Sequence, residues 1–314
     1  MILAPLRGVT IRCFREIFAE EIRAAGFTEA ITPFITANAG YDPLKDRELA
    51  FTVPEASSPR GVGTEAVRRS APRGEGASGT VKVTPQFIGK DPTALRTCLE
   101  KVKAAGYDTA DLNCGCPFPM VRNKGRGSGI LRTPDVFRRM LEVGCAVMGA
   151  GKFSIKARLG VDRGDELLRL MPMINEFPLR FLTVHARTAR QMYAGIVDVR
   201  NLEEIWKVAK VPIVVNGDIP FPPTDRSAPS QLRNLATSQI MIGRSFIRFL
   251  GTREDSGELL GRYIAASQGE LCGDRPVLGR MKELISYWKD LPRWTRRWDI
   301  IKICRSVDEL RAII

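Results

Sequence analysis

Residues 111–129 read DLNCGCPFPMVRNKGRGSG. The stretch begins as a short buried strand, and Cys116 stands against Pro117 at the point where that strand must turn. Three cationic residues and three glycines alternate after the turn: Arg122, Lys124 and Arg126, with Gly125, Gly127 and Gly129. A thiol at the end of a strand, beside an amide and a cationic glycine loop, indicates a chemical site. The rest of the chain is interpreted as the scaffold around it.

Short apolar runs of the same kind recur along the chain, with helical patterns between most of them. Eight runs end in turn or polar residues, at 1–6, 29–35, 81–88, 109–113, 153–159, 181–186, 211–216 and 238–243. Apolar strands that alternate with helices predict an α/β fold with a parallel sheet covered on both faces. Eight strand–helix units over about 245 residues match a TIM (β/α)8 barrel. A doubly wound sheet is the alternative, but no G-x-G-x-x-G follows the first strand.

Two stretches depart from this repeat. Residues 54–80 are rich in Pro, Gly, Ser and Arg and predict a long mobile insertion between the second and third strands. From about residue 246 the strand signal disappears, and 257–268 and 277–290 have helical patterns. The sequence therefore predicts a barrel over 1–245 and a small all-helical domain over 246–314.

The chain is strongly basic. Its 314 residues include 48 Lys and Arg against 35 Asp and Glu, a net charge of +13. The excess gathers at 60–73, 122–139 and 293–305. A solvated basic surface would explain the charge, but its clustering favours a polyanionic partner. No apolar run could span a bilayer and the start lacks the pattern of a signal peptide, so we expect a cytoplasmic protein.

The cysteines predict neither disulfides nor a metal. Seven are scattered along the chain, which is typical of reduced thiols. Cys114 and Cys116 form a close pair, but no second pair exists and the chain has one histidine. A four-ligand zinc site is therefore not expected.

In a barrel of this kind the active site lies at the carboxyl ends of the strands. The residues at those ends are amides, one lysine, the only histidine, a thiol and two glycine turns. They are Pro5 to Val9, Gln86, Asn113, Cys116, Lys156, His185, Asn216, Gly217, Asp218, Gly243 and Arg244. Either of the glycine turns after the last two strands, taken alone, could be an ordinary strand-to-helix turn. Occurring together, with Arg244 beside them, they favour a phosphate site.

Lys156 and His185 each have two interpretations. Lys156 lies in an apolar strand with Arg158 on the same face, and a lysine is seldom buried without a partner. It either lies on an edge strand and extends its side chain to water or stabilises an anionic ring such as a reduced flavin. His185 is structural or contacts a ligand, and only its neighbours at the strand ends favour a ligand.

Cys116 has three interpretations: an inert buried thiol, a nucleophile paired with His185, or a proton donor. A thiol that keeps its proton near neutral pH can act as a general acid. Cys114 competes, because two residues apart on an extended strand the two thiols would face the same side. Pro117 places Cys116 in the turn, and we favour Cys116.

These motifs resemble the tRNA-dihydrouridine synthases, flavoenzymes that reduce particular uridines of folded tRNA. The resemblance covers the chain apart from 54–80, and the segment 280–290 is most similar to the bacterial branch lettered C. The matching segments are APLRGVT (4–10), PQFIGKDP (85–92), DLNCGCPFPMVRNKGRGSGIL (111–131), IKARLG (155–160), VHARTARQMYAG (184–195), VNGDI (215–219) and MIGR (241–244). Arg7 departs from the family, which has a small or acidic residue there.

The resemblance implies a TIM barrel with non-covalent FMN, NADPH as the reductant and a helical C-terminal domain that grips tRNA. It implies hydride transfer from reduced flavin to carbon 6 of uracil, with Cys116 as the acid that protonates carbon 5. Pro5, Gln86, Asn113, Lys156 and His185 match flavin-contacting positions. Asn216, Gly217, Asp218, Gly243 and Arg244 match the phosphate seat, and Arg122, Arg187, Arg293, Arg296 and Arg297 are expected to bind the RNA. A monomer without metal is expected.

Three alternatives remain. The chain could be an FMN barrel acting on a free pyrimidine, like a dihydroorotate dehydrogenase, but such an enzyme needs no basic tail. It could act on rRNA. It could also have kept an RNA surface and lost catalysis, against which the presence of Cys116, Lys156 and His185 argues.

Overall fold

The structure is a computed structural model that describes residues 1–49, 81–223 and 239–314. Its described strands form one sheet, and each pair in it is parallel. The strands are β1 (Ile2–Leu3), β2 (Glu29–Ile31), β3 (Ile35–Thr36), β4 (Lys82–Thr84), β5 (Gln86–Ile88), β6 (Ala110–Cys114), β7 (Phe153–Gly160), β8 (Leu182–Thr188), β9 (Ile213–Asn216) and β10 (Ile240–Ile242). Each of the eight predicted runs overlaps at least one of them, and β3, β6, β7 and β8 extend one or two residues beyond the predicted ends.

The sheet closes on itself as a barrel. The strand order is β3-β5-β6-β7-β8-β9-β10-β1-β2-β4. At one end of this order β2 pairs with β4, and at the other end β3 pairs with β5. Because β2 and β3 follow each other in the chain, as do β4 and β5, the same two chain segments join both ends of the sheet. Pro33 and Pro85 interrupt these two segments, since proline has no N–H for the ladder. At the break the hydroxyl of Thr32 accepts the Gln86 N–H at 3.0 Å. The TIM barrel predicted from the sequence is confirmed.

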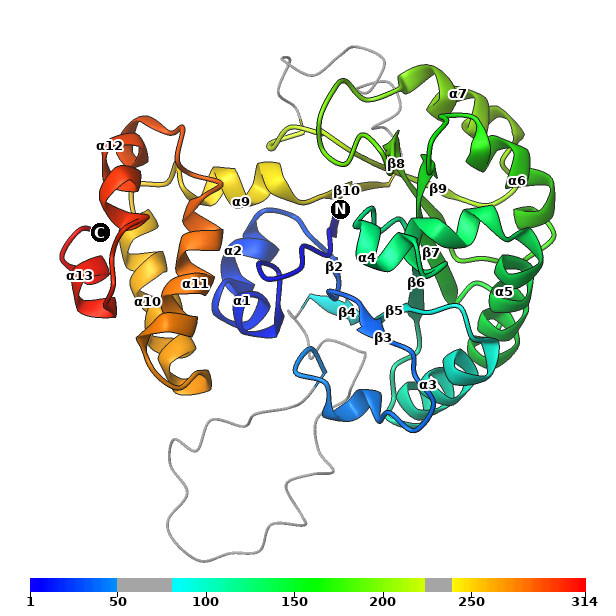
Figure 1. The fold of residues 1–314 in the computed structure, drawn as a ribbon, viewed down its shortest axis with the longest axis horizontal. Coiled ribbons are helices and arrows are strands. Elements are labelled where there is room, and N and C mark those ends of the chain that lie inside the picture. The colour runs from blue at the N-terminus through cyan, green and yellow to red at the C-terminus, as the bar shows by residue number, and fades with distance from the viewer. Residues whose placement is uncertain (50–80, 224–238) are drawn as a thin grey trace, which may run out of the picture.

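Helices cover the outside of this barrel. They are α1 (Arg12–Ile17), α2 (Ala19–Ala24), α3 (Pro92–Ala104), α4 (Pro119–Arg122), α5 (Pro134–Met148), α6 (Glu166–Ile174) and α7 (Val199–Val208), with short 3-10 helices η1 (Pro43–Lys45) and η3 (Gly127–Arg132). Figure 1 shows α3, α5, α6 and α7 as an outer layer on one side of the strands. Proline begins α3 and α5, and the Asp91 side chain caps α3 by accepting the Thr93 N–H.

Alternation along the strands separates the hydrophobic core from the barrel interior. In β7, Phe153, Ile155 and Ala157 belong to the main core that the strands share with the helices. Ser154 and Lys156 alternate with them and so point into the barrel. A second, smaller apolar cluster inside the ring consists of Ile2, Ala4, Ile31, Phe181, Val214 and Met241. Polar side chains therefore occupy the interior above an apolar plug.

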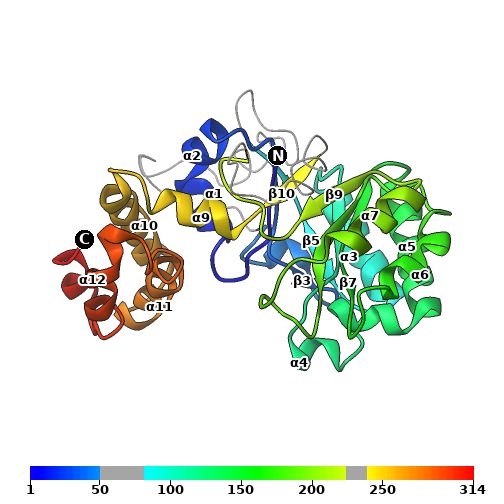
Figure 2. The same cartoon turned by 90° about the horizontal axis from the view of Figure 1, so that it is seen from above.

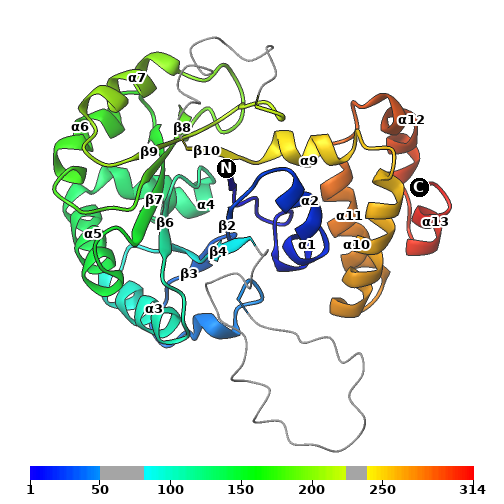
Figure 3. The same cartoon turned by 180° about the vertical axis from the view of Figure 1, so that it is seen from behind.

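Beyond the barrel the described chain is helical, as predicted. The helices are α9 (Arg244–Leu250), α10 (Ser256–Glu270), α11 (Asp274–Ile285), α12 (Pro292–Ile301) and α13 (Val307–Arg311). In Figures 1 and 3 they lie together beside α1 and α2, on the opposite side of the barrel from α5 and α6, and Figure 2 shows the same separation from above. The domain boundary at 245/246 stays a prediction.

Aromatic and ionic contacts hold this helical group on the barrel. The ring of Tyr263 in α10 lies 6.0 Å from that of Phe14 and 5.5 Å from that of Phe18. Arg12 of α1 donates to Glu270 at 2.6 Å, at the surface of the same contact. Burial of several large side chains makes this a packed interface and not a flexible tether.

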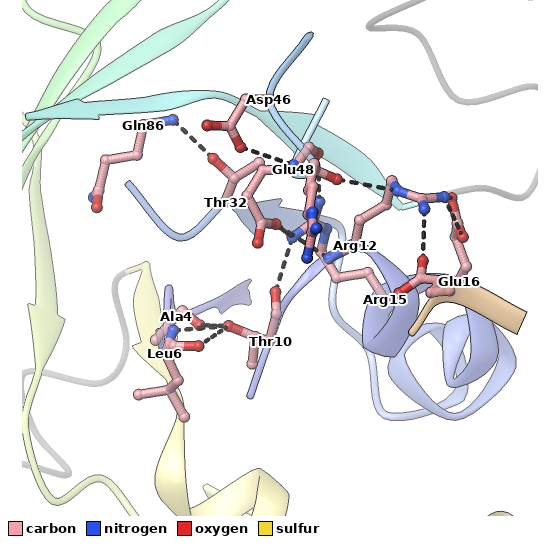
Figure 4. Close-up of polar contacts among 12 residues, drawn as sticks. Ala4, Leu6, Thr10, Arg12, Arg15, Glu16, Thr32, Asp46, Glu48 and Gln86 are labelled. Carbon is pink, nitrogen blue, oxygen red and sulfur yellow. Dashed lines mark hydrogen bonds and ion pairs between the residues drawn. The ribbon is translucent and has the colours of Figure 1, made fainter. Parts of the chain in front are cut away.

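The segment that follows β1 is fixed by its own hydrogen bonds (Figure 4). The Thr10 hydroxyl donates to the Ala4 carbonyl at 3.0 Å and accepts the Leu6 N–H at 2.7 Å. Behind it, Arg15 bonds the Thr10 carbonyl and the Glu48 carboxylate, each at 2.8 Å. This network holds the turn that carries Pro5 at the mouth of the barrel.

The predicted insertion at 54–80 lies outside the residues that the structure describes. None of the helices described for this chain is both long and apolar enough to cross a lipid bilayer.

Candidate active site

A cavity of about 980 Å³ opens at the carboxyl ends of the strands. All the residues predicted at those ends line it except Val9: they are Pro5 to Gly8, Gln86, Asn113, Cys116, Lys156, His185, Asn216, Gly217, Asp218, Gly243 and Arg244. Val9 is instead buried in the main hydrophobic core. The strand register explains the gathering, because Asn113 lies beside Lys156 and His185 beside Asn216 on neighbouring strands. Residues from distant parts of the sequence thus meet in one place.

The end of β6 shapes the turn that carries the thiol. The Asn113 carboxamide oxygen accepts the Cys116 N–H at 2.8 Å and the Gly115 N–H at 3.1 Å. Cys116 lines the cavity, whereas Cys114 is fully buried in the core between strands and helices. The expectation that the two thiols share one side is wrong, because β6 ends at Cys114 and the chain then turns.

Gly127 and Ser128 hold Cys116 from the other side. The N–H and the hydroxyl of Ser128 donate to the Cys116 carbonyl at 3.1 and 2.8 Å. Gly127 has a φ of +57°, and a Cβ there would lie 2.7 Å from the Cys116 Cβ. Only glycine satisfies both the backbone angle and the close approach.

Burial determines the protonation of Cys116. Desolvation raises the pKa of its thiol, and the backbone of Phe118 and the charges of Arg7 and Arg158 oppose the shift without cancelling it. The thiol therefore keeps its proton at neutral pH. That state suits a proton donor and not a thiolate nucleophile.

Lys156 is a cation inside the barrel. Its ammonium donates to the Asn216 carboxamide at 2.8 Å, and the Asn216 amide donates to the Met241 carbonyl at 2.8 Å. Burial, and then the charge of Arg158, lower the pKa of Lys156 to about 7. An anionic ligand in the cavity would restore the charged form.

His185 is buried against the turn after β9. Its Nε2 atom has no hydrogen-bond partner within the described residues. Burial and the charges of the surrounding cations hold the pKa of His185 well below its ordinary value, so the imidazole is neutral at pH 7. A Cβ on Gly217 would lie 2.8 Å from the His185 ring. The space between this turn and the ring is therefore free only because residue 217 is a glycine.

Asp218 organises the proposed phosphate turns. Its carboxylate accepts from Arg244 at 2.7 Å and also from Arg187. Asp218 has a φ of +47°, in the left-handed region that an Asp tolerates better than most residues. A carboxylate at this place holds two guanidinium groups in position, and it would compete with a phosphate for them.

Two residues of the cavity wall, Arg158 and Tyr193, had no predicted role. The Arg158 guanidinium donates to the carbonyls of Gly115 at 2.9 Å and Met192 at 2.6 Å, so it ties the turn after β6 to the turn after β8. The ring centre of Tyr193 lies 5.3 Å from the Arg158 Cζ and 4.8 Å from the Arg244 Cζ. Alternation with Lys156 was the signal that places Arg158 in the interior.

The helical group also reaches the cavity, which the sequence did not predict. Glu283, Ser286, Tyr287 and Asp290 are among the lining residues. The approach is close, because a Cβ on Gly8 would lie 2.4 Å from a carboxylate oxygen of Glu283. The mouth therefore has walls from both parts of the chain.

The arginines expected to bind RNA lie elsewhere. Arg293 and Arg296 are exposed on α12, and Arg297 lies over the Trp294 ring at 5.6 Å. Arg122 is half-buried in α4. Arg187 is 1% exposed and bonded to Ala194, Gly195 and Asp218, so it supports the wall of the cavity, and a direct contact with RNA is not favoured there.

The donor set fits a planar, electron-rich cofactor such as FMN. The unpaired His185 nitrogen, the half-buried Lys156 ammonium and the open glycine turns are features that a bound anionic ring system would satisfy. Among the described residues, no three His, Cys, Asp or Glu side chains gather where they could hold a metal ion.

Comparison with known proteins agrees with this geometry. The family model described as dihydrouridine synthase (Dus) matches residues 2–248. The tRNA-dihydrouridine(16) synthase of Salmonella typhimurium is 28% identical over 250 residues, which cover 78% of this chain and 72% of that protein. The tRNA-dihydrouridine synthase B of Pseudomonas aeruginosa is 24% identical over 246 residues, 78% of this chain and 65% of that protein. The match thus spans about two thirds of the length of the second relative.

Solved structures align with this chain at low similarity. An old yellow enzyme homologue from Zymomonas mobilis aligns with a TM-score of 0.49 and 14% identity, covering 79% of this chain and 85% of that one. Morphinone reductase in complex with tetrahydroNAD aligns with a TM-score of 0.44 and 16% identity, covering 79% and 83%.

Proposed function

This chain belongs to the dihydrouridine synthase family and is an oxidoreductase, and we propose that it reduces specific uridines of tRNA to 5,6-dihydrouridine, with bound FMN and with NADPH as the reductant. The observation that supports this most strongly is the gathering of the predicted strand-end residues other than Val9, including a protonated thiol, around one cavity.

FMN, when bound, would supply the hydride for carbon 6 of the uracil ring. Gln86, Asn113 and Lys156 would hold it through hydrogen bonds from the floor of the cavity, and Pro5 would lie along it. His185 would offer its unpaired nitrogen to the same ligand. The glycine turns at Gly217 and Gly243, with Arg244, would receive its phosphate.

Cys116 would hold the second hydrogen, as a proton on Sγ destined for carbon 5. Its raised pKa keeps that proton available at neutral pH. Negative charge builds on the uracil carbonyls as hydride arrives, and cationic and N–H groups around the cavity would stabilise it. Lys156 is one such group, and it can gain positive charge as the negative charge develops, because its pKa lies at about 7.

The RNA would be held by the basic surface. A uridine must leave its stack to enter the cavity, and phosphate contacts offset the cost of unstacking. Arg122 and the arginines of α12 are the proposed contacts, and the walls that α11 adds to the mouth would position the extruded base. We expect the protein to act as a monomer in the cytoplasm, where tRNA is found.

The proposal is tested with purified, FMN-loaded protein and NADPH. Unmodified tRNA transcripts, an rRNA fragment and free uracil are incubated in parallel, and dihydrouridine or dihydrouracil is measured by mass spectrometry. We expect product in tRNA alone. Reduction of free uracil without reduction of tRNA would support the free-pyrimidine alternative, and product in rRNA alone would make rRNA the substrate.

A further inference from the structure

A chain of hydrogen bonds runs beneath the cavity from Asp111 to Cys116. The Gln86 amide donates to the Asp111 carboxylate at 2.8 Å, and the Asn113 amide donates to the Gln86 carbonyl oxygen at 2.8 Å. The Asn113 oxygen then accepts the backbone N–H groups of Gly115 and Cys116. Asp111 itself is fully buried, and it is not one of the residues that line the cavity.

The two ends of this chain fix the direction of every bond in it. A carboxylate can only accept, and burial raises the pKa of Asp111 only to about 6, so it is ionised at neutral pH. A backbone N–H can only donate. An amide could be turned by 180° without changing its shape, but here either amide, if turned, would face two donors or two acceptors against each other.

This direction determines what the floor of the cavity offers to a ligand. An amide nitrogen has two hydrogens and an ammonium has three. Gln86 and Asn113 each use one within the chain of bonds, and Lys156 uses one on Asn216. All three residues line the cavity, and the oxygens of both amides are occupied by donors. The Asn113 oxygen receives two donors, which fill its two lone pairs, whereas the Gln86 oxygen receives one and keeps one lone pair. Free N–H groups therefore outnumber free acceptors on these three side chains.

We propose that Asp111 is a positioning residue that makes the cavity floor a donor-rich surface, selective for the carbonyl and ring-nitrogen edge of a cofactor that accepts hydrogen bonds. The inference rests on the proposed function for the identity of that cofactor, FMN. The same bonds set the backbone position of Cys116, so one buried carboxylate aligns the flavin seat with the acid. Ser154 donates to the other Asp111 oxygen at 2.6 Å and supports the carboxylate without taking part in the chain.

The test compares two substitutions at Asp111 by FMN affinity and flavin midpoint potential, without any RNA. Asp111→Leu removes the acceptor, so we expect FMN affinity to fall by about tenfold or more and the potential to become more negative. Asp111→Asn can still accept from Gln86 through its oxygen, while its amide donates to Ser154. We therefore expect this variant to stay within about threefold of wild type.

Ser154→Ala is the matched control, since it removes a bond to Asp111 but leaves the direction of the chain unchanged. An Asp111→Leu variant with wild-type affinity and potential would overturn the inference. Asp111→Asn as weak as Asp111→Leu would also overturn it, because the charge and not the direction would then be responsible.

If Asp111→Leu does not fold, a neutron crystal structure of the wild-type protein decides. Deuterium on Gln86 Nε2 pointing to Asp111 is expected, and a reversed amide would contradict the inference. Failure of the proposed function is separate: it would appear as tight FMN binding with the Asp111 effects intact but no reduction of tRNA.

Discussion

The ionisable side chains around the cavity share one electrostatic property. Burial favours the neutral form of Cys116, of Lys156 and of His185, because each loses hydration that its charged form needs. The permanent positive charges nearby belong to arginines, which keep theirs. A ligand that brings negative charge into the cavity therefore changes the protonation state of Lys156 first.

Lys156 gives a prediction about stability and pH. Its pKa falls from an ordinary value of 10.5 to about 7 in the folded protein. Between these pH values the unfolded chain binds more protons than the folded protein, so Lys156 makes the free energy of unfolding rise with pH. Below pH 7 Lys156 lowers the free energy of unfolding by its full amount. Lys156→Met should remove that slope.

We therefore expect FMN-free Lys156→Met to be more stable than wild type at pH 7. The difference in the free energy of unfolding should be at most on the order of a few kcal/mol, because water in the cavity screens the lysine charge. The advantage should shrink as pH approaches 10.5. Urea denaturation of both proteins across this pH range measures it, and a difference that does not vary with pH would contradict the assignment. The variant should also bind FMN weakly.

At the scale of elements, the positions of the strands were predictable from the sequence, but the side-chain contacts between neighbouring strands were not. Apolar runs ended by turn residues located all eight strand segments, since that pattern is local. The splitting at Pro33 and Pro85 follows from proline chemistry. The bonds of Arg158 to the turns after β6 and β8 depend on which strands become neighbours, and no local pattern in one sequence contains that information.

The turn between β6 and η3 gives a prediction of its own. Gly127→Ala adds a Cβ at 2.7 Å from that of Cys116 and strains a positive φ. We expect Cys116 to move by several tenths of an ångström or more, so dihydrouridine formation should fall by at least about tenfold while FMN binding is retained.

Gly149→Ala is the matched control, because Gly149 also has a positive φ, of +100°, but nothing lies within 4 Å of its Cβ position. Rates of tRNA reduction and FMN affinity are compared for both variants. An equal loss of rate in both would assign the effect to backbone strain and contradict the role of Gly127 beside the thiol.

At the scale of the whole molecule, the helical group is part of the site as well as a neighbour. The change from strands to helices near residue 246 was visible in the sequence, but the contact of Glu283 with Gly8 was not, because it joins segments far apart in the chain. Tyr263 and Trp288 are buried in the core that this group shares with the barrel. Truncation at 246 should therefore destabilise the barrel, so surface substitutions are the better test of RNA binding.

Arg296→Glu tests whether α12 binds the tRNA. Arg296 is exposed, so we expect its reversal to weaken tRNA binding by about tenfold, and the slope of log K against log salt to fall by about one. Arg200→Glu on α7 is the control: it is also exposed and changes the net charge equally, but it lies outside the three basic clusters, and α7 is far from α12 (Figure 1). Equal weakening by both would reduce the effect to net charge.

The proposed chemistry depends most on Cys116 as the proton donor. The direct measurement is dihydrouridine formed per tRNA in a single turnover, with FMN-loaded protein first reduced by NADPH, for wild type, Cys116→Ala and Cys114→Ala. We predict normal flavin reduction in all three, product in wild type and Cys114→Ala, and a loss of at least about a hundredfold in Cys116→Ala. Full product from Cys116→Ala would contradict this role for the thiol.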